Sequence, residues 1–502
     1  MRPIRWAAGL LLALTAGKSA PPRVQIDTGV LEGDGDGHLA AFKGIPYAAP
    51  PVGAWRWKPP RPAEAWTGIR AARELGPICP QTDRWPTVRR KLTTMLGGDP
   101  SWVPPLGPTS EDCLSLNVWT TNLGGKSKQP VMVWLHGGAF AFGSGSDDAA
   151  VLAPLGVVVV TLNYRLGVLG FMAHPALAKE SAHDSSGAYG LLDQIEALRW
   201  VQRNIAAFGG DPGRVTVFGH SAGGGAALQL LASPLARGLV HRAVSQSGSN
   251  GETRPRVAAE AKGVELATKL GAPAGDPLPF LRAQSPERLF AAASGPFDPV
   301  ADGWVLPEAM PGALIGGHGA DVPLLLGATA KEAAIFPVPD TLLDYRALVE
   351  TSGPSRKERL LALYPAGTDA EARAAAIQYV TDRDFVCAAR DVADKRRGPT
   401  WFYLVSALPT PGPAGVRVGA YHGSDVRFMF NLGYGVPISD VGQRVGDAMR
   451  RYWVRFAATG DPNQPGLPPW PSYERTQPRH LELGDPIHSV SGPGGAGCGV
   501  FD

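Results

Sequence analysis

A serine with small residues on both sides lies where a strand pattern changes directly into a helix pattern. Residues 215–218 have the apolar and β-branched character of a buried strand, and residues 226–232 form a run rich in alanine and leucine. Between them lies Gly219-His220-Ser221-Ala222-Gly223. Small residues permit the tight backbone angles and the close strand–helix packing of such a turn. We therefore expect an α/β fold that holds the Ser221 hydroxyl above a sheet edge, next to the N–H of Ala222 at a helix N-terminus.

A second glycine-rich turn lies upstream of this serine. The apolar residues 131–135 predict a buried parallel strand, and the strand ends in His136-Gly137-Gly138. Because glycine leaves its backbone amide uncovered, the amides of Gly137, Gly138 and Ala222 can stabilise the oxyanion that develops in ester cleavage. The chain has 63 glycines, so one glycine–serine motif alone is weak evidence. Because a second glycine turn is present, a catalytic role for the motif around Ser221 is favoured over a merely structural one.

A serine hydroxyl is a weak nucleophile until a base and a carboxylate support it. In α/β-hydrolases the chain order is serine, acid, histidine. Glu332 follows a strand predicted over residues 322–327, and His422 follows a strand predicted over residues 401–405 and a Pro/Gly-rich loop. Both therefore lie beyond the ends of strands, where α/β sheets place chemistry. Asp425, close behind His422, is an alternative acid, and Glu332 is favoured mainly by the resemblance described below.

Two other histidines lie beside the predicted site. The chain has ten histidines, and most histidines in a protein are surface or satisfied core residues. His220 is too close to Ser221 in the sequence to rotate into the position of a base, and His136 precedes the oxyanion glycines. We expect a structural or supporting role for both, so that His422 is the expected base.

Further motifs run in order along nearly the whole chain. They are residues 42–47, 111–114, 162–171, 193–194, 204–205, 208–212, 246–248 and 460–463, in addition to the segments above. Together they resemble one family, the type-B carboxylesterases, which are related to the cholinesterases and have the α/β-hydrolase fold. The resemblance implies a large, mostly parallel central sheet with helices on both faces and helical cap or lid insertions. It also implies hydrolysis of carboxylic esters through an acyl-enzyme.

The resemblance also assigns roles to individual residues. It implies a catalytic triad of Ser221, Glu332 and His422. It also implies that the oxyanion donors are Gly137, Gly138 and Ala222. Ser247 is expected to support the acid, the alternative being an ordinary small residue in a turn.

The chain departs from the family pattern at two places. The residue before the nucleophile is often glutamate in the family, whereas this chain has His220. The acid usually lies in an Asp-Glu-Gly setting, and here the sequence is Lys331-Glu332-Ala333. Because alanine lacks the backbone freedom of glycine, the loop that carries the acid is expected to follow a different path.

Four cysteines allow three disulfide connectivities, and their spacing alone selects none. The resemblance implies a Cys79–Cys113 bond, whose loop contains Trp85 and Trp102, and a Cys387–Cys498 bond; four reduced thiols are the alternative. Trp102 lies near the position where cholinesterases hold a tryptophan for cationic substrates, but we expect an ordinary packing role for it.

Residues 1–20 have the pattern of a secretory signal peptide. Two arginines precede the apolar residues 6–17, and small residues and two prolines follow. This apolar run is shorter than the roughly 20 residues that a membrane span needs. Cleavage after Gly17 or after Ala20 fits equally well. We expect a secreted or periplasmic protein, and an oxidising compartment would permit both disulfides.

Residues 21–502 are expected to form a single domain, because strand and helix signals alternate without a long linker. One of these signals is an amphipathic helix predicted over residues 189–207. Insertions around residues 250–320 and 337–400 are rich in alanine, proline and charge, and we expect them to form the cap that shapes the pocket.

The composition and motifs also exclude several classes of partner. A net charge of +3 over 502 residues gives no basic stripe for nucleic acid. No motif has metal-ligand spacing, so we expect no metal and no cofactor. The expected partner is a small-molecule ester. The alternatives are a lipase or amidase of the same fold and a non-catalytic cholinesterase-like binding protein, and the sequence favours no particular ester or oligomeric state.

Overall fold

The computed structural model describes residues 20–125, 127–316, 321–351, 355–433, 435–492 and 497–501. The signal peptide expected over residues 1–20 therefore lies outside the described residues, except for Ala20. No described helix has both the length and the apolar character that crossing a membrane requires.

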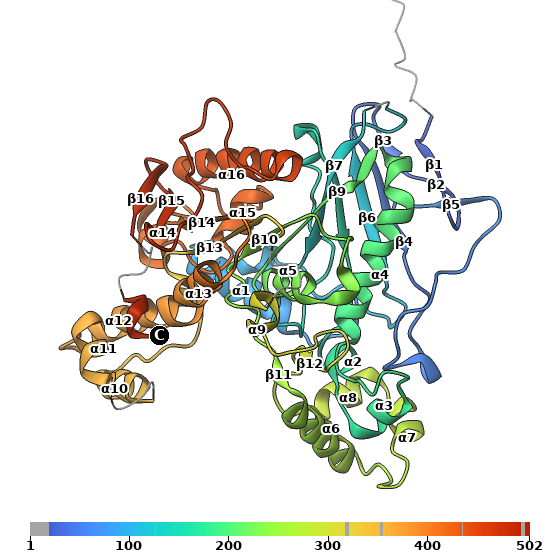
Figure 1. The fold of residues 1–502 in the computed structure, drawn as a ribbon, viewed down its shortest axis with the longest axis horizontal. Helices are drawn as coiled ribbons and strands as arrows, with labels where there is room; N and C mark the ends of the chain where they lie inside the picture. Colours follow the sequence, from blue (N-terminus) through green and yellow to red (C-terminus); the bar gives the residue numbers. More distant parts are fainter. Residues whose placement is uncertain are drawn as a thin grey trace, which may run out of the picture.

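A twisted sheet of 11 strands forms the centre of the molecule (Figure 1). In pairing order its strands are β16 (His488–Ser491), β15 (Arg479–Leu483), β14 (Thr400–Val405), β13 (Leu324–Thr329), β10 (Arg242–Gln246), β9 (Gly210–His220), β7 (Gln129–Leu135), β8 (Val158–Leu162), β6 (Ser115–Thr120), β4 (Ala40–Pro46) and β3 (Asp34–Gly35). The strands from β15 to β8 pair in parallel, and the remaining strands at both edges pair antiparallel. The expectation of a large, mostly parallel sheet is confirmed.

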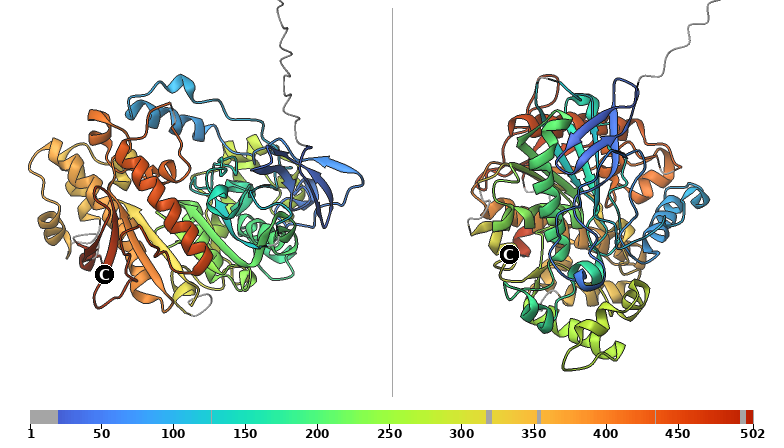
Figure 2. Two further views of the ribbon diagram at one scale, coloured as in Figure 1. Left: turned by 90° about the horizontal axis from the view of Figure 1, so that it is seen from above. Right: turned by 90° about the vertical axis from the view of Figure 1, so that its right-hand side faces the viewer.

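Helices cover both faces of this sheet. Successive side chains of a strand point to opposite faces, and β7 shows the result. Val131 and Val133 belong to the apolar cluster that contains α4 (Tyr189–Asn204) and α5 (Ala222–Ala232). Met132 and Trp134 belong to the cluster on the other face, which contains α16 (Asp440–Thr459). The left view of Figure 2 shows α16 lying across the sheet.

The remaining helices lie around this core. They are α1 (Arg84–Met95), α2 (Gly167–Phe171), α3 (Pro175–Glu180), α6 (Arg256–Leu270), α7 (Leu278–Arg282), α8 (Pro286–Ala292), α9 (Gly312–Ile315), α10 (Leu342–Glu350), α11 (Lys357–Leu363), α12 (Asp369–Thr381), α13 (Cys387–Lys395), α14 (Gly412–Val418) and α15 (Ser424–Met429). Small strands pair outside the main sheet, namely β1 (Arg23–Ile26), β2 (Gly29–Glu32) and β5 (Ile69–Ala71), and β11 (Arg254–Pro255) with β12 (Val300–Ala301).

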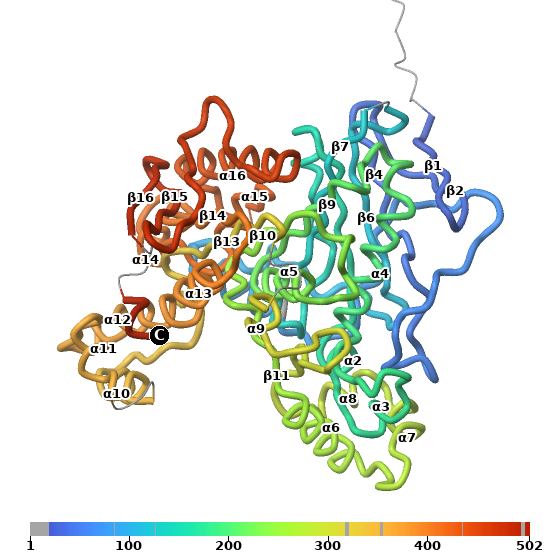
Figure 3. The backbone as a smooth tube through the Cα atoms, in the orientation of Figure 1, coloured from blue at the N-terminus to red at the C-terminus, as the bar shows by residue number. Residues whose placement is uncertain are grey.

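Two helical groups correspond to the segments in which insertions were expected. Residues 250–316 contain α6 to α9, and α6 and α8 lie at the lower end of the molecule in Figure 3. Residues 337–400 contain α10 to α13, and α10, α11 and α12 form a lobe beside the sheet with an apolar cluster of its own. A π-helix, η7 (Asp382–Val386), joins α12 to α13 and lies at the junction between this lobe and the sheet.

Disulfides connect two outlying segments to this frame. The structure contains both the Cys79–Cys113 and the Cys387–Cys498 bond. The first closes the loop that carries α1, whose C-terminal half packs in one apolar cluster with Ala334 and Tyr421. Trp102 in the same loop is 77% exposed, so the expected packing role is wrong. Trp102 ends a short 3₁₀ helix, η2 (Pro100–Trp102), at the surface of the molecule.

Candidate active site

The serine turn joins β9 to α5 with strained backbone angles. Ser221 has φ 56° and ψ −124°, a conformation that costs a non-glycine residue about 1–3 kcal/mol. Its N–H donates to the carbonyl of Gln246 at 2.8 Å, and its carbonyl accepts from the N–H of Gly225 at 2.9 Å. A Cβ atom on Gly219 or Gly223 would lie 2.4 Å or 2.0 Å from a backbone oxygen. The two glycines are therefore required by close packing at the turn.

The oxyanion turn lies beside it because β7 pairs in parallel with β9. Gly137 and Gly138 follow the end of β7, and a Cβ atom on Gly137 would lie 3.2 Å from the Cβ of Ser221. Gly138 has φ 120°, and a Cβ atom there would lie 1.9 Å from the carbonyl oxygen of Phe142. Among the described residues, neither glycine N–H has an acceptor. These two amides and the first amide of α5, that of Ala222, can stabilise an anion next to the serine.

The carboxylate of Glu332 is bound directly to the imidazole of His422. Glu332 begins η6 (Glu332–Ile335) and is fully buried. Its Oε2 lies 2.5 Å from His422 Nδ1. Its Oε1 accepts from Ser247 Oγ at 2.6 Å and from the backbone N–H of Thr329 at 2.7 Å. One oxygen is thus fixed by two donors, which aims the other oxygen at the imidazole.

The loops that carry the acid and the histidine run side by side. The N–H of Lys331 donates to the carbonyl of Ala420 at 2.9 Å, and Lys331 and Tyr421 form an isolated parallel bridge. Glu332 and His422 are the next residues along the two loops. Backbone pairing therefore sets the distance between the two side chains.

Three rings surround the imidazole of His422, whose side chain is 9% exposed. The ring centres of His220, Phe336 and Phe385 lie 4.4, 5.0 and 5.1 Å from it. His220 precedes Ser221, so this contact brings the histidine loop against the serine turn. In this conformation the Ser221 hydroxyl makes no hydrogen bond to His422 within the described part of the chain.

The alternative acid, Asp425, is bound elsewhere. It is fully buried on α15 and accepts from Gln246 Nε2 and from the backbone N–H of Val426, both at 2.9 Å. Burial raises the pKa of Asp425 to about 6, and the charge of Glu332 adds to this effect while the hydrogen bond from Gln246 opposes it. Its Oδ1 lies 4.0 Å from Nε2 of His220, which is too long for a hydrogen bond.

His136 holds the oxyanion turn from behind. Its Nδ1 donates to the carbonyl of Gly137 at 2.9 Å, and its ring stacks on Tyr164 with centres 4.4 Å apart. Burial lowers the pKa of His136 to about 4, so the ring is neutral at physiological pH. The hydrogen bond and the neutral ring agree with the structural role expected from the sequence.

Sequence reasoning missed several neighbours of the site. Phe336 follows η6 and Phe385 lies in η7, and their rings stack on each other with centres 5.9 Å apart. No sequence pattern identifies the π-helix that brings Phe385 there. The double contact of Gln246, through its carbonyl to Ser221 and its side chain to Asp425, also has no signal in the sequence.

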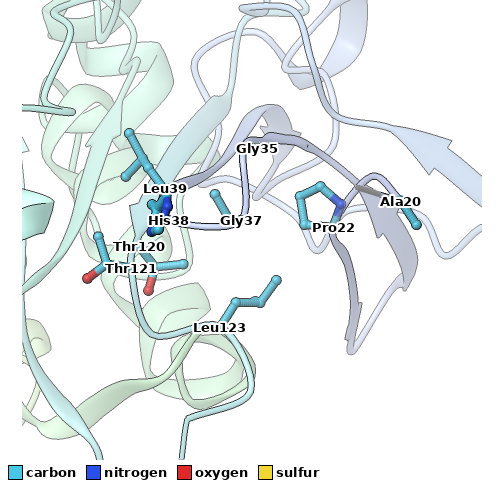
Figure 4. Close-up of a pocket in the computed structure, with 10 residues that line it drawn as sticks. Ala20, Pro22, Gly35, Gly37, His38, Leu39, Thr120, Thr121 and Leu123 are labelled. Carbon is cyan, nitrogen blue, oxygen red and sulfur yellow. The ribbon is translucent and has the colours of Figure 1, made fainter. Parts of the chain in front are cut away.

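Features elsewhere in the structure do not add to this site. A cavity of about 230 Å³ at the β3–β4 edge of the sheet is lined by residues such as Pro22, His38 and Thr121 (Figure 4). It contains none of the residues described above. In the described ranges, no group of three or more His, Cys, Asp and Glu side chains could hold a metal ion.

Known proteins match this chain along almost its whole length. The sequence profile of the carboxylesterase family matches residues 20–493. A fumonisin B1 esterase from Sphingopyxis macrogoltabida is 38% identical over 477 residues, which cover 89% of this chain and 84% of the relative. A para-nitrobenzyl esterase from Bacillus subtilis (strain 168) is 34% identical over 494 residues, which cover 93% of this chain and 95% of the relative.

The fold leads to the same family. A solved structure of a PNB esterase matches with a TM-score of 0.81 and 33% identity, over 94% of this chain and 97% of that one. A structure of a thermophilic PNB esterase has a TM-score of 0.81 and 32% identity, over 96% and 99% of the two chains. The resemblance seen in the sequence motifs is thus confirmed: this chain belongs to the carboxylesterase family and is a carboxylic ester hydrolase.

Proposed function

We propose that this enzyme hydrolyses small-molecule carboxylic esters with Ser221 as nucleophile, His422 as base and Glu332 as the acid. Ser221 Oγ attacks the ester carbonyl while His422 takes the hydroxyl proton, and the same proton is then given to the departing alcohol. Water next attacks the acyl-enzyme, with His422 again taking a proton and returning it to Ser221. The acid product leaves and the starting state is restored.

The hydrogen bond between Glu332 and His422 is the observation that carries this proposal. With Nδ1 of His422 donating to the carboxylate, Nε2 is left as the acceptor that a base needs. Ser221 is presented by a strained turn whose neighbour His220 touches the His422 ring. A hydrogen bond from the serine to its base is often long without substrate and shortens when substrate binds.

The oxyanion formed at each step is assigned to the amides of Gly137, Gly138 and Ala222. The two glycine N–H groups have no acceptor among the described residues, so they are available to a ligand. Because the donors are fixed before the reaction, they stabilise the developing charge without reorganising. Removing one such donor typically costs about 100- to 1000-fold in rate.

The chain organisation is part of the same proposal. Residues 1–20 are a signal peptide, and residues 21–502 are one exported domain, secreted or periplasmic, with cap insertions around residues 250–320 and 337–400. The two disulfides support this, because such bonds persist in oxidising compartments. Two measurements test this organisation. One determines the N-terminus of the exported protein, and the other titrates free thiols after denaturation without reduction. Four reactive thiols would contradict the proposed compartment.

The decisive experiment targets the nucleophile. We expect Ser221→Ala to lower kcat on para-nitrophenyl acetate by about a millionfold, because the triad acts as a unit. Wild-type protein should gain one phosphonate adduct per chain, located on Ser221 by peptide mass spectrometry. Near-normal turnover by Ser221→Ala, or wild-type protein without an adduct, would contradict the proposal and favour a binding protein.

The substrate class requires a separate measurement. Relatives carry names that refer to fumonisin B1 and para-nitrobenzyl esters. We propose esters for this chain and expect hydrolysis of para-nitrophenyl acetate to exceed that of para-nitroacetanilide, the matching amide. Long-chain triglyceride emulsions separate esterase from lipase activity, and faster cleavage of the emulsion or of the amide would reassign the class.

A further inference from the structure

His220 occupies the position where the family often has a carboxylate. The residue ends β9, directly before Ser221, and its side chain is 12% exposed. Its ring lies 4.4 Å from the ring of His422, tilted by 47°. Its Cε1 atom would lie 3.4 Å from a Cβ atom on Gly423, the next residue of the same loop. The ring of His220 thus packs against the histidine loop.

No hydrogen bond holds this ring within the described residues. Its Nε2 is buried without a partner, 4.0 Å from Asp425 Oδ1. Both oxygens of Asp425 already accept other hydrogen bonds, from Val426 and Gln246. Without a hydrogen bond to a carboxylate, the ring lacks the contact that most directly offsets the cost of burying its charge.

The ionisable groups around His220 come from three elements and one loop. Asp425 on α15 and His422 face the ring directly, and these two contact Tyr403 on β14, at 3.5 Å from Asp425 Oδ2, and Glu332 on η6. Burial, and then the charge of His422, lowers the pKa of His220 well below its ordinary value. Two cationic imidazoles 4.4 Å apart would also repel each other, so His220 is neutral whenever His422 is protonated.

We propose that His220 is a positioning residue that packs as a neutral ring against His422, so that, in the part of the chain that the structure describes, the imidazolium formed during catalysis contacts the carboxylate of Glu332 and no other. This inference rests on the proposed function, since it assumes that His422 is the base. A carboxylate at position 220 would favour protonated His422, which cannot accept the proton of Ser221. The neutral ring therefore keeps the base in its working form to lower pH than a carboxylate there would.

The test measures kcat/KM as a function of pH and compares the acid limb of this profile between the wild type and two variants. The His220→Glu variant introduces a carboxylate, and the His220→Gln variant is the matched neutral control. An opposite charge within about 4–6 Å of an ionisable group typically changes the pKa of that group by about 1–3. We expect the acid limb of His220→Glu to lie about 1–3 pH units above that of the wild type, and that of His220→Gln to stay in place, with lower kcat from lost ring packing.

The outcomes separate charge from packing. An unmoved acid limb in His220→Glu, or an equal shift in both variants, would overturn the proposal, because charge at position 220 would then not matter. If His220→Glu does not fold, as judged by near-UV circular dichroism, the smaller carboxylate of His220→Asp takes its place. Phosphonate labelling of Ser221 in the wild type and in each variant distinguishes the two claims. If the wild type is not labelled, the proposed function is refuted. If labelling is normal but the acid limb of His220→Glu does not move, only this inference is refuted.

Discussion

Two carboxylates of this enzyme, Glu332 and Asp425, are equally buried, yet only one is bonded to a histidine. Glu332 Oε2 lies 2.5 Å from His422, whereas Asp425 Oδ1 lies 4.0 Å from His220. The difference arises from where the other donors bind. Ser247 and Thr329 both donate to Oε1 of Glu332 and leave Oε2 to the imidazole, whereas each oxygen of Asp425 already accepts from a donor other than His220. Burial therefore does not make a carboxylate a partner for a base; a free, well-aimed oxygen does.

The largest effect expected from this contrast is on turnover. Glu332→Gln should lower kcat by about 10,000-fold, because an amide cannot stabilise the imidazolium or keep its tautomer. Asp425→Asn, an equally conservative change at an equally buried site, should lower kcat by less than about tenfold, since Asp425 does not contact His422 by a hydrogen bond. Initial rates on para-nitrophenyl acetate measure both. A reversed order would show that Asp425 is the acid.

A smaller effect on turnover should follow when Glu332 loses one of its hydrogen-bond donors. Ser247→Ala removes the donor at 2.6 Å from Glu332 Oε1, and a hydrogen bond to a charged group contributes about 1.5–3 kcal/mol. We expect kcat to fall by about 10- to 100-fold, with KM little changed. Ser245→Ala is the matched control, because Ser245 is a buried serine on β10, two residues before Ser247, and donates to the carbonyl of Gly224 instead. Equal losses in both variants would reduce the role of Ser247 to packing.

The last effect concerns stability and pH. Because the pKa of Asp425 is raised to about 6 in the folded state, its protonated form favours folding. That contribution is complete below the ordinary pKa of 3.8 and is lost as the pH rises through about 6. The wild type should thus lose up to about 3 kcal/mol of unfolding free energy relative to Asp425→Asn between pH 4 and pH 7. Urea unfolding at several pH values measures this, and a pH-independent difference would contradict the raised pKa.

Much of this arrangement could be predicted from local sequence. The strand signals before Gly137, Ser221 and Glu332 correspond to β7, β9 and β13, because parallel strands buried on both faces are continuously apolar. The helix predicted over residues 189–207 is α4, which ends at Asn204 and passes into a 3₁₀ turn over Ile205–Phe208. Boundaries differ because short-range signals do not resolve how the last helical turn tightens.

Other features depend on contacts between distant segments and could not be predicted. Phe385 reaches His422 only because a π-helix joins α12 to α13. The 4.0 Å gap between Asp425 and His220 depends on the side-chain amide of Gln246, which lies far from both in the sequence. The exposure of Trp102 depends on the path of a disulfide-closed loop, which its residue type does not reveal.

Gln246 holds Ser221 and Asp425 through different kinds of atom. Ser221 is anchored by the main-chain oxygen of residue 246, which every amino acid has, while Asp425 is anchored by a side chain that a single codon change can replace. Substitutions at position 246 can therefore change the hydrogen bonding of Asp425, next to His220, and still keep the hydrogen bond to the N–H of Ser221. The strained backbone of Ser221 is thus held by a main-chain oxygen that a side-chain substitution at position 246 does not remove.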